Sequence, residues 1–231
     1  MSQTHVALYT AIYGNSDWVK PAPKGLDHLP KLYTDSDDVA DKAWGQGWAP
    51  VIRPHYITTL KGEPQIVAPM LAHKWWKTHP ELACPGSDVS LWIDGSMEVH
   101  VDDYVLRCLD ALGQDDWACV PHPSRVCVFD EGRYSSTLTW RYDSQAMLDQ
   151  IAFYAQFHPP QWGLIATGAN ARRHTPEVIE LSHRWWDECL TWSHQDQLSL
   201  PVLLRLAEGK VRWNMNLPWH RDWILHEHGT R

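Results

Sequence analysis

Residues Val89 to Ile93 form a continuous apolar run that ends at Asp94-Gly95-Ser96. A short run without alternation of apolar and polar side chains is expected of a strand that is buried on both faces. Such strands occur mainly in parallel sheets that are covered by helices on both sides. This segment therefore constrains the fold more than any other part of the sequence.

Strand-like and helix-like segments alternate along the chain. The predicted strands are His5 to Tyr13, Leu29 to Thr34, Pro50 to Arg53, Val89 to Ile93 and Trp117 to Pro121. The predicted helices begin at the caps Asp102, Ser144 and Thr175-Pro176, and a last helix runs from about Gln197 through Leu206 and stops at Gly209. Residues Gln161 to Arg173, with two glycines and two arginines, are typical of a loop over the site. The alternation predicts one α/β domain over residues 1–231, with a mainly parallel sheet flanked by helices and a ligand at the carboxyl ends of its strands.

Composition excludes several classes of protein. The five cysteines are scattered and never form a CxxC pair, which indicates buried free thiols rather than a disulfide framework or a zinc site. No apolar stretch approaches the roughly 20 residues that span a bilayer, and we expect no membrane span and a cytoplasmic location. A net charge of −8 argues against a protein that grips nucleic-acid phosphates over a broad surface.

Two acidic positions are the first candidates for chemistry. Asp94 follows the buried strand, where a carboxylate would bind a divalent cation and Gly95 would let a ligand approach the backbone. Asp196 and Gln197 could hydrogen-bond a sugar or stabilise an oxocarbenium-like transition state. The structural alternatives are a turn aspartate at Asp94 and a helix N-cap at Asp196.

Two further groups are less specific. His122-Pro123-Ser124-Arg125 follows a predicted strand, so Arg125 could bind phosphate near Asp130 and Glu131, or form an ordinary surface ion pair. His226 and His228 near the C-terminus could supply a metal ligand, or belong to a solvated tail.

These short motifs, taken in their order along the chain, resemble a known family: the glycosyltransferase-like domain of plant mucilage and pollen-tube proteins, which also occurs in bacteria. The resemblance spans roughly residues 6 to 203. Its motifs are Tyr9-Thr10-Ala11-Ile12-Tyr13-Gly14, Tyr33-Thr34-Asp35, Lys74 between Pro64 and His79-Pro80-Glu81, Leu91-Trp92-Ile93-Asp94-Gly95-Ser96, His122-Pro123-Ser124-Arg125 leading to Asp130-Glu131, and His194-Gln195-Asp196-Gln197-Leu198-Ser199.

The resemblance implies a GT-A fold with one nucleotide-sugar site. By position, it assigns Thr10, Ala11 and Tyr13 to the nucleoside pocket, Asp35 to the base or ribose, and Lys74 to the pyrophosphate. It also places Asp94 at the metal and phosphate station and Asp196-Gln197 at the donor sugar. The family departs from this sequence at two positions: Ser96 stands where GT-A enzymes usually have the second carboxylate of Asp-x-Asp, and Gln195 stands where an arginine is expected. Dependence on a manganese or magnesium cofactor is therefore in question. His226 or His228 could replace the missing carboxylate as a metal ligand, or a lysine or an arginine could replace the cation.

We therefore expect a hexosyl- or pentosyltransferase that moves a sugar from a nucleoside diphosphate sugar to a hydroxyl acceptor. Among the donors, a UDP-sugar is favoured. Inversion would need Asp196 or Glu131 as general base. Two alternatives stay open: a hydrolase of ceramide-like amides or esters, and a non-catalytic nucleotide-sugar binder. The acceptor could be a glycan, a small molecule, a protein or a modified nucleobase. Candidate acceptor contacts are a basic rim of Arg133, Arg141, Arg172 and Arg173 and the tryptophans Trp140, Trp162 and Trp192.

Overall fold

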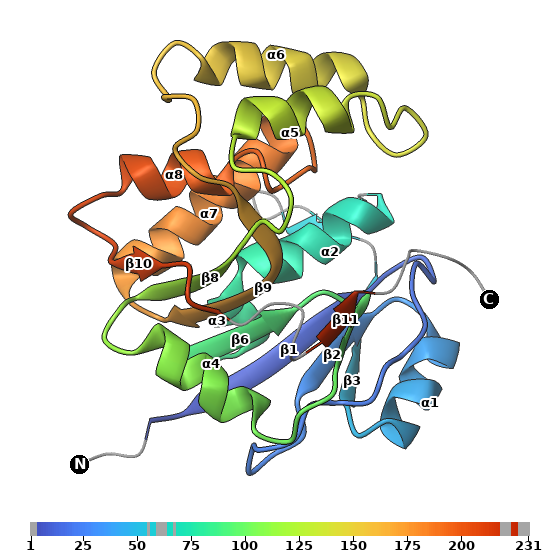
Figure 1. The fold of residues 1–231 in the computed structure, drawn as a ribbon. Coiled ribbons are helices and arrows are strands. Elements are labelled where there is room, and N and C mark those ends of the chain that lie inside the picture. The colour runs from blue at the N-terminus through green and yellow to red at the C-terminus, as the bar shows by residue number, and fades with distance from the viewer. Residues whose placement is uncertain (1–3, 55, 59–63, 67, 218–222, 226–231) are drawn as a thin grey trace.

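The structure, a computed structural model, describes residues 4–54, 56–58, 64–66, 68–217 and 223–225. A sheet of seven strands forms its centre (Figure 1) in the order β10-β8-β9-β6-β1-β2-β3. These strands are β1 (Val6–Ile12), β2 (Lys31–Thr34), β3 (Ala49–Ile52), β6 (Val89–Ile93), β8 (Trp117–Pro121), β9 (Ile165–Arg173) and β10 (Trp213–Asn214). Two small antiparallel sheets pair β4 (Tyr56–Thr58) with β5 (Pro64–Ile66) and β7 (Met97–Val99) with β11 (Trp223–Leu225).

The prediction of a mainly parallel sheet is confirmed. Strand β1 pairs in parallel with both β2 and β6, β2 pairs in parallel with β3, and β8 in parallel with β10. Among the described strands of this sheet, β9 alone runs antiparallel, between β6 and β8. The carboxyl ends of β1, β2 and β6 and the beginning of β9 therefore meet at one edge of the sheet.

Helices cover both faces of the sheet because successive side chains of each strand point to opposite sides. In β1, Tyr9 and Ala11 belong to one buried apolar cluster, and Leu8 and Ile12 to another. The first cluster is completed by α2 (Pro69–Thr78), α3 (Pro80–Ala83), α7 (Pro176–Thr191) and α8 (Leu200–Leu206), and the second by α1 (Asp37–Gly45) and α4 (Tyr104–Leu112).

A third apolar cluster lies beyond the sheet edge. Helices α5 (Val128–Ser135) and α6 (Ser144–Tyr154) pack there against each other, at the top of Figure 1. Met147 and Ile151 of α6 belong to this cluster together with Val128 and Phe129 of α5. The loop that joins the two helices therefore lies near the ligand-binding edge that the sequence predicts.

The interpretation of residues 161–173 as a loop is wrong, because β9 occupies residues 165–173 in the middle of the sheet. Asn170 and Arg172, two of the polar residues that made the segment look exposed, are buried and bonded. Arg172 donates to the hydroxyl of Tyr9 at 2.6 Å, and Asn170 accepts from Trp117 Nε1 at 2.9 Å. A buried polar group is tolerated when such partners are present.

Several helix boundaries also differ from the prediction. Helix α8 begins at Leu200 rather than Gln197, with Pro201 in its first turn, where a missing N–H costs little. Asp103 and Asp143 precede α4 and α6, in place of the predicted caps Asp102 and Ser144. The Thr175 cap of α7 is confirmed, and all five cysteines are buried, as predicted. No helix within the described residues is long and apolar enough to cross a membrane.

Candidate functional site

Two cavities open at the edge of the sheet where β1 and β6 end. The first, of about 290 Å³, is lined by Ala11, Tyr13, Pro69, Met70, His73 and Trp140, among others. The second, of about 230 Å³, is lined by Glu131, Tyr134, Tyr142, Thr167, Gln195, Asp196 and Gln197, among others. Both cavities include Lys74, Asp94, Ser96 and Arg141, and we call these four residues the neck.

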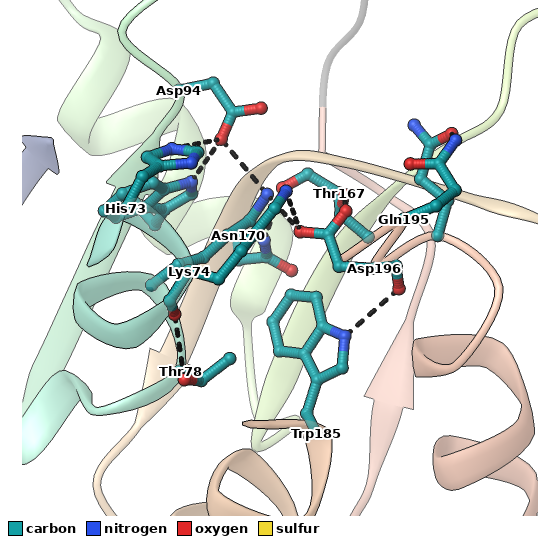
Figure 2. A network of polar contacts seen from close by, with 12 residues as sticks. His73, Lys74, Thr78, Asp94, Thr167, Asn170, Trp185, Gln195 and Asp196 are labelled. Atoms are coloured by element: carbon teal, nitrogen blue, oxygen red, sulfur yellow. Dashed lines mark hydrogen bonds and ion pairs between the residues drawn. The ribbon is translucent and has the colours of Figure 1, made fainter. Parts of the chain in front are cut away.

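A buried cluster of two carboxylates and two ammonium groups lies at the neck. Asp94 Oδ1 accepts from Lys77 Nζ at 3.1 Å, and Asp196 Oδ2 accepts from Lys74 Nζ at 2.7 Å and lies 2.8 Å from Lys77 Nζ. Asp196 Oδ1 accepts from the hydroxyl of Thr167 at 2.8 Å. Figure 2 shows Lys74 between Asp94 and Asp196. We call Lys74, Lys77, Asp94 and Asp196 the ion cluster.

Helix α2 brings both lysines to this position. Lys74 and Lys77 are three residues apart, so they lie on one face of the helix. The side chain of Lys77 is fully buried, and its ammonium group lies 5.7 Å from the ring centres of both Trp92 and Trp185. Aromatic faces stabilise a desolvated cation, which explains how a lysine is accommodated there.

The four charges of the ion cluster balance. Burial alone would raise the pKa of Asp94, but Lys77 and the neighbouring His73 outweigh it and hold that pKa well below its usual range. Burial opposes ionisation of Asp196 too, and Lys74 and Lys77 lower its pKa. Burial would lower the pKa of Lys74, but Asp196 and Asp94 raise it. The cluster is therefore neutral as a whole while all four members are charged.

The donor set at the neck does not fit a divalent cation. Such ions bind carboxylate oxygens at about 2.0–2.6 Å, yet Asp94 Oδ1 already accepts from Lys77 and, at 2.8 Å, from Trp92 Nε1. A cation at Asp94 would lie beside an ammonium group, and Ser96 offers no second carboxylate. Within the described ranges, no group of three or more His, Cys, Asp or Glu side chains is placed to hold a metal. His226 and His228 lie outside the described residues.

A second polar group lines the cavity on the side of α5. Glu131 accepts from Ser135 Oγ at 2.8 Å, from Gln195 Nε2 at 2.9 Å and from Arg125 Nε. His122 accepts the backbone N–H groups of residues 124 and 125 through Nδ1, so it shapes the turn that carries Arg125. Arg125 is therefore engaged with Glu131 and does not line either cavity.

The residues assigned to the nucleoside divide into two sets. Ala11, Tyr13, Gly95 and Ser96 line the first cavity. Thr10 is buried and Asp35 accepts the backbone N–H of Gly14 at 3.1 Å, and both lie outside the lining of the two cavities. The structure therefore brings part of the predicted nucleoside set to a cavity.

Gly95 packs directly against the end of β1. A Cβ at this position would lie 2.7 Å from Ile12 Cγ1 and 3.2 Å from the carbonyl oxygen of Ala11. We expect Gly95→Ala to cost about 1–3 kcal/mol in the free energy of unfolding, because overpacking a tight contact forces a backbone shift. Urea denaturation measures this change. The control is Gly45→Ala in α1, where a Cβ meets nothing within 4 Å and no loss of stability is expected. Equal effects of the two substitutions would contradict the close packing of Gly95 against β1.

Sequence reasoning missed Lys77 and His73. Lys77 lies three residues after the predicted Lys74 and four residues after His73, and this helical spacing was the signal that could have identified both. His73 Nε2 lies 3.6 Å from Asp94 Oδ1, and burial lowers its pKa.

The predicted acceptor contacts are scattered. Arg172 is buried, Arg173 donates to the carbonyls of residues 113 and 115 at the opposite end of β9, and Arg133 pairs with Asp130 at 2.6 Å. Trp162 packs beside Trp213, and Trp192 stacks on Phe153. Of these residues, Arg141 and Trp140 line the cavities, and Trp140 is 77% exposed.

Comparisons with known proteins agree with this architecture. A family model described as "TOD1/MUCI70, glycosyltransferase-like domain" matches residues 79–226 of the 231. A sequence search of curated proteins finds no match.

Solved structures with a similar fold include the bifunctional glycosyltransferase WbbM in its apo form, with a TM-score of 0.50 and 12% identity over 87% of this chain and 38% of that chain. Mouse xyloside xylosyltransferase 1, also in the apo form, has a TM-score of 0.46 and 8% identity over 91% of this chain and 84% of that chain.

Proposed function

Because the chain belongs to the TOD1/MUCI70 glycosyltransferase-like family and has a GT-A fold, we propose that it transfers a sugar from a nucleoside diphosphate sugar to a hydroxyl acceptor. The observation that carries this proposal is the pair of cavities that meet at the ion cluster. The cluster lies at the carboxyl ends of β1 and β6, where open α/β sheets bind their ligands.

We assign the parts of the donor to the two cavities as follows. The first cavity is largely apolar and offers an exposed indole at Trp140, so we assign it to the nucleoside. The second cavity carries amide, hydroxyl and carboxylate groups suited to sugar hydroxyls, so we assign it to the donor sugar and the incoming acceptor oxygen. The pyrophosphate then crosses the neck. We take a UDP-sugar as the first donor to test.

During transfer, the bond between the anomeric carbon and the β-phosphate oxygen breaks, and its electron pair stays with the departing diphosphate. The acceptor oxygen bonds to the anomeric carbon and loses its proton. Lys74 would stabilise the charge that develops on the diphosphate, because its ammonium group is held in place by Asp196. Asp196 has both oxygens engaged by Lys74, Lys77 and Thr167, so we assign it a positioning role.

The destination of the acceptor proton decides the stereochemistry. Inversion would need Glu131 as the base, which requires that it release one of its donors Ser135, Gln195 and Arg125. If the departing phosphate oxygen accepts the proton instead, the configuration is retained. Gln197 lines the same cavity and is assigned to the sugar hydroxyls. Proton NMR of the product's anomeric signal distinguishes the two routes.

Nucleotide binding is the direct test of the proposal. Thermal shift and calorimetry with UDP, GDP, CDP and their common hexose and pentose sugars are run in EDTA and again with manganese. We expect one nucleotide series to stabilise the protein by RT ln(1 + [L]/Kd), about 2.7 kcal/mol at one hundred times Kd. Trp140→Ala is expected to weaken binding about tenfold, since stacking on a base contributes roughly 1–3 kcal/mol.

The matched control is Trp44→Ala, which removes an exposed indole on α1 that lines neither cavity. Binding without turnover against a broad acceptor panel would favour the non-catalytic binder. Cleavage of a ceramide-like amide or ester, with no response to any nucleotide, would replace the proposal with the hydrolase.

A further inference from the structure

The described side chains around the neck include three cations that are paired with carboxylates. Lys74 and Lys77 are balanced by Asp94 and Asp196, and Arg125 is balanced by Glu131. A nucleoside diphosphate adds negative charge that this balanced set does not offset. Among the described residues that line both cavities, Lys74 and Arg141 are the permanent cations.

We propose that Arg141, together with Lys74, binds the pyrophosphate of the donor and supplies the positive charge for which many GT-A enzymes use a divalent cation. This inference rests on the proposed function. Arg141 belongs to the neck, so its side chain borders both the nucleoside cavity and the sugar cavity. The bond that breaks during transfer joins the parts of the donor that these two cavities hold.

The loop between α5 and α6 holds Arg141 at this position. The hydroxyl of Tyr142 donates to Gln195 Oε1 at 3.2 Å, and its ring lies 4.9 Å from the ring of His194. The guanidinium of Arg141 in turn lies 5.1 Å from the ring centre of Tyr142. Asp143 closes the loop by accepting the first N–H groups of α6 at 3.0 and 3.1 Å. These contacts tie the loop to the segment that carries Asp196.

The chemistry of the two cations is complementary. A guanidinium presents several N–H donors in a planar fork that matches two phosphate oxygens at once, whereas an ammonium group acts as a point charge. Lys74 is fixed by Asp196, and Arg141 reaches the neck from a separate element. A pyrophosphate between them would be contacted from α2 on one side and from the α5–α6 loop on the other. The donor set at Asp94, which does not fit a metal, points to the same arrangement.

Calorimetry with uridine, UMP and UDP in EDTA tests this inference, with the guanosine or cytidine series used instead if the nucleotide screen selects it. We expect the wild type to bind the diphosphate far more tightly than the nucleoside without any metal. Arg141→Gln should weaken diphosphate binding about 10- to 100-fold and leave nucleoside binding within twofold. Arg141→Lys should recover part of the loss. The control, Arg107→Gln on α4, removes an exposed guanidinium paired with Asp103 and should change neither affinity.

A merely structural role for Arg141 would lower the affinities for nucleoside and diphosphate together, and that result would overturn the inference. A requirement for manganese in the wild type, or undiminished diphosphate binding by Arg141→Gln, would also overturn it while leaving the proposed function in place. If the wild type binds no nucleoside or nucleotide in any condition, the proposed function fails, and this inference fails with it.

Discussion

Asp196→Asn is expected to lower the free energy of unfolding by about 3–5 kcal/mol, the usual effect of removing one partner from a buried ion pair, and to abolish sugar transfer. Asp196 is 2% exposed and offsets two ammonium groups, one of which belongs to the fully buried Lys77. The asparagine keeps the shape of the side chain but leaves Lys74 and Lys77 with Asp94 as their remaining carboxylate. Urea denaturation at pH 7.5 gives the stability, and donor turnover gives the activity.

A double-mutant cycle separates charge from packing. Lys77→Met removes the charge, keeps an unbranched side chain that is one heavy atom shorter, and leaves Asp94 and Asp196 with one lysine. Combining Lys77→Met with Asp196→Asn restores neutrality through Lys74 and Asp94, so we expect the double variant to be about 2–3 kcal/mol more stable than additivity predicts. Asp35→Asn is the control, because its carboxylate lies outside the cavities. Strict additivity, or a loss below about 1 kcal/mol for Asp196→Asn, would contradict the charge balance.

The parts of the fold that could be predicted from the sequence are those with a local cause. Strands β6 and β8 have the predicted bounds because each is a short apolar run ended by a turn. Helix α7 begins at the predicted Thr175-Pro176, since a threonine side chain and a proline in the first turn satisfy the helix start locally. The order of these elements was enough to predict a mainly parallel α/β sheet.

Strand β9 could not be predicted because its stability comes from distant residues. Arg172 and Asn170 are buried only because Tyr9 and Trp117, far away in the sequence, bond to them. A polar segment with a glycine at residue 168 has the local pattern of a loop. Its partners appear only when β6 and β8 are placed on either side of it.

The candidate site divides in the same way. Asp94 could be predicted from its position after a buried strand, Asp196 from its position at the start of the last predicted helix, and Lys74 from the family resemblance. The bond between Lys74 and Asp196 joins residues 122 positions apart, and nothing local indicates it. Lys77 was missed because a lysine on an amphipathic helix usually faces solvent, whereas here Trp92 and Trp185 enclose it.

Stability is expected to fall by several kcal/mol as the pH is lowered from about 6.5 to about 4. Burial lowers the pKa of His79 to about 3 and the pKa values of His158, His174 and His194 to about 4. These histidines stay neutral in the folded protein over a range where the unfolded chain binds protons near pH 6.5. The unfolded state therefore binds more protons, and each such histidine lowers the free energy of unfolding by at most about 1.4 kcal/mol per pH unit.

The histidine effect is separable from that of the carboxylates. The pKa values of Asp94, Asp116 and Asp196 are lowered in the folded state, so the stability they contribute is lost only as the pH falls below about 4. Urea denaturation at pH 7.5, 6.5, 5.5 and 4.5 should show the loss of stability that the histidines cause above pH 4. His158→Gln preserves an acceptor for Arg205 Nε. It should reduce the slope of the free energy of unfolding against pH by the contribution of about one bound proton.

His100→Gln is the matched control, because it makes the same replacement at an exposed position beside Glu98. A free energy of unfolding that stays constant between pH 6.5 and 4.5 would show that these histidines are protonated in the folded protein. The polar contacts around them, and the neutral state assigned to His194 beside the Arg141 loop, would then need to be revised.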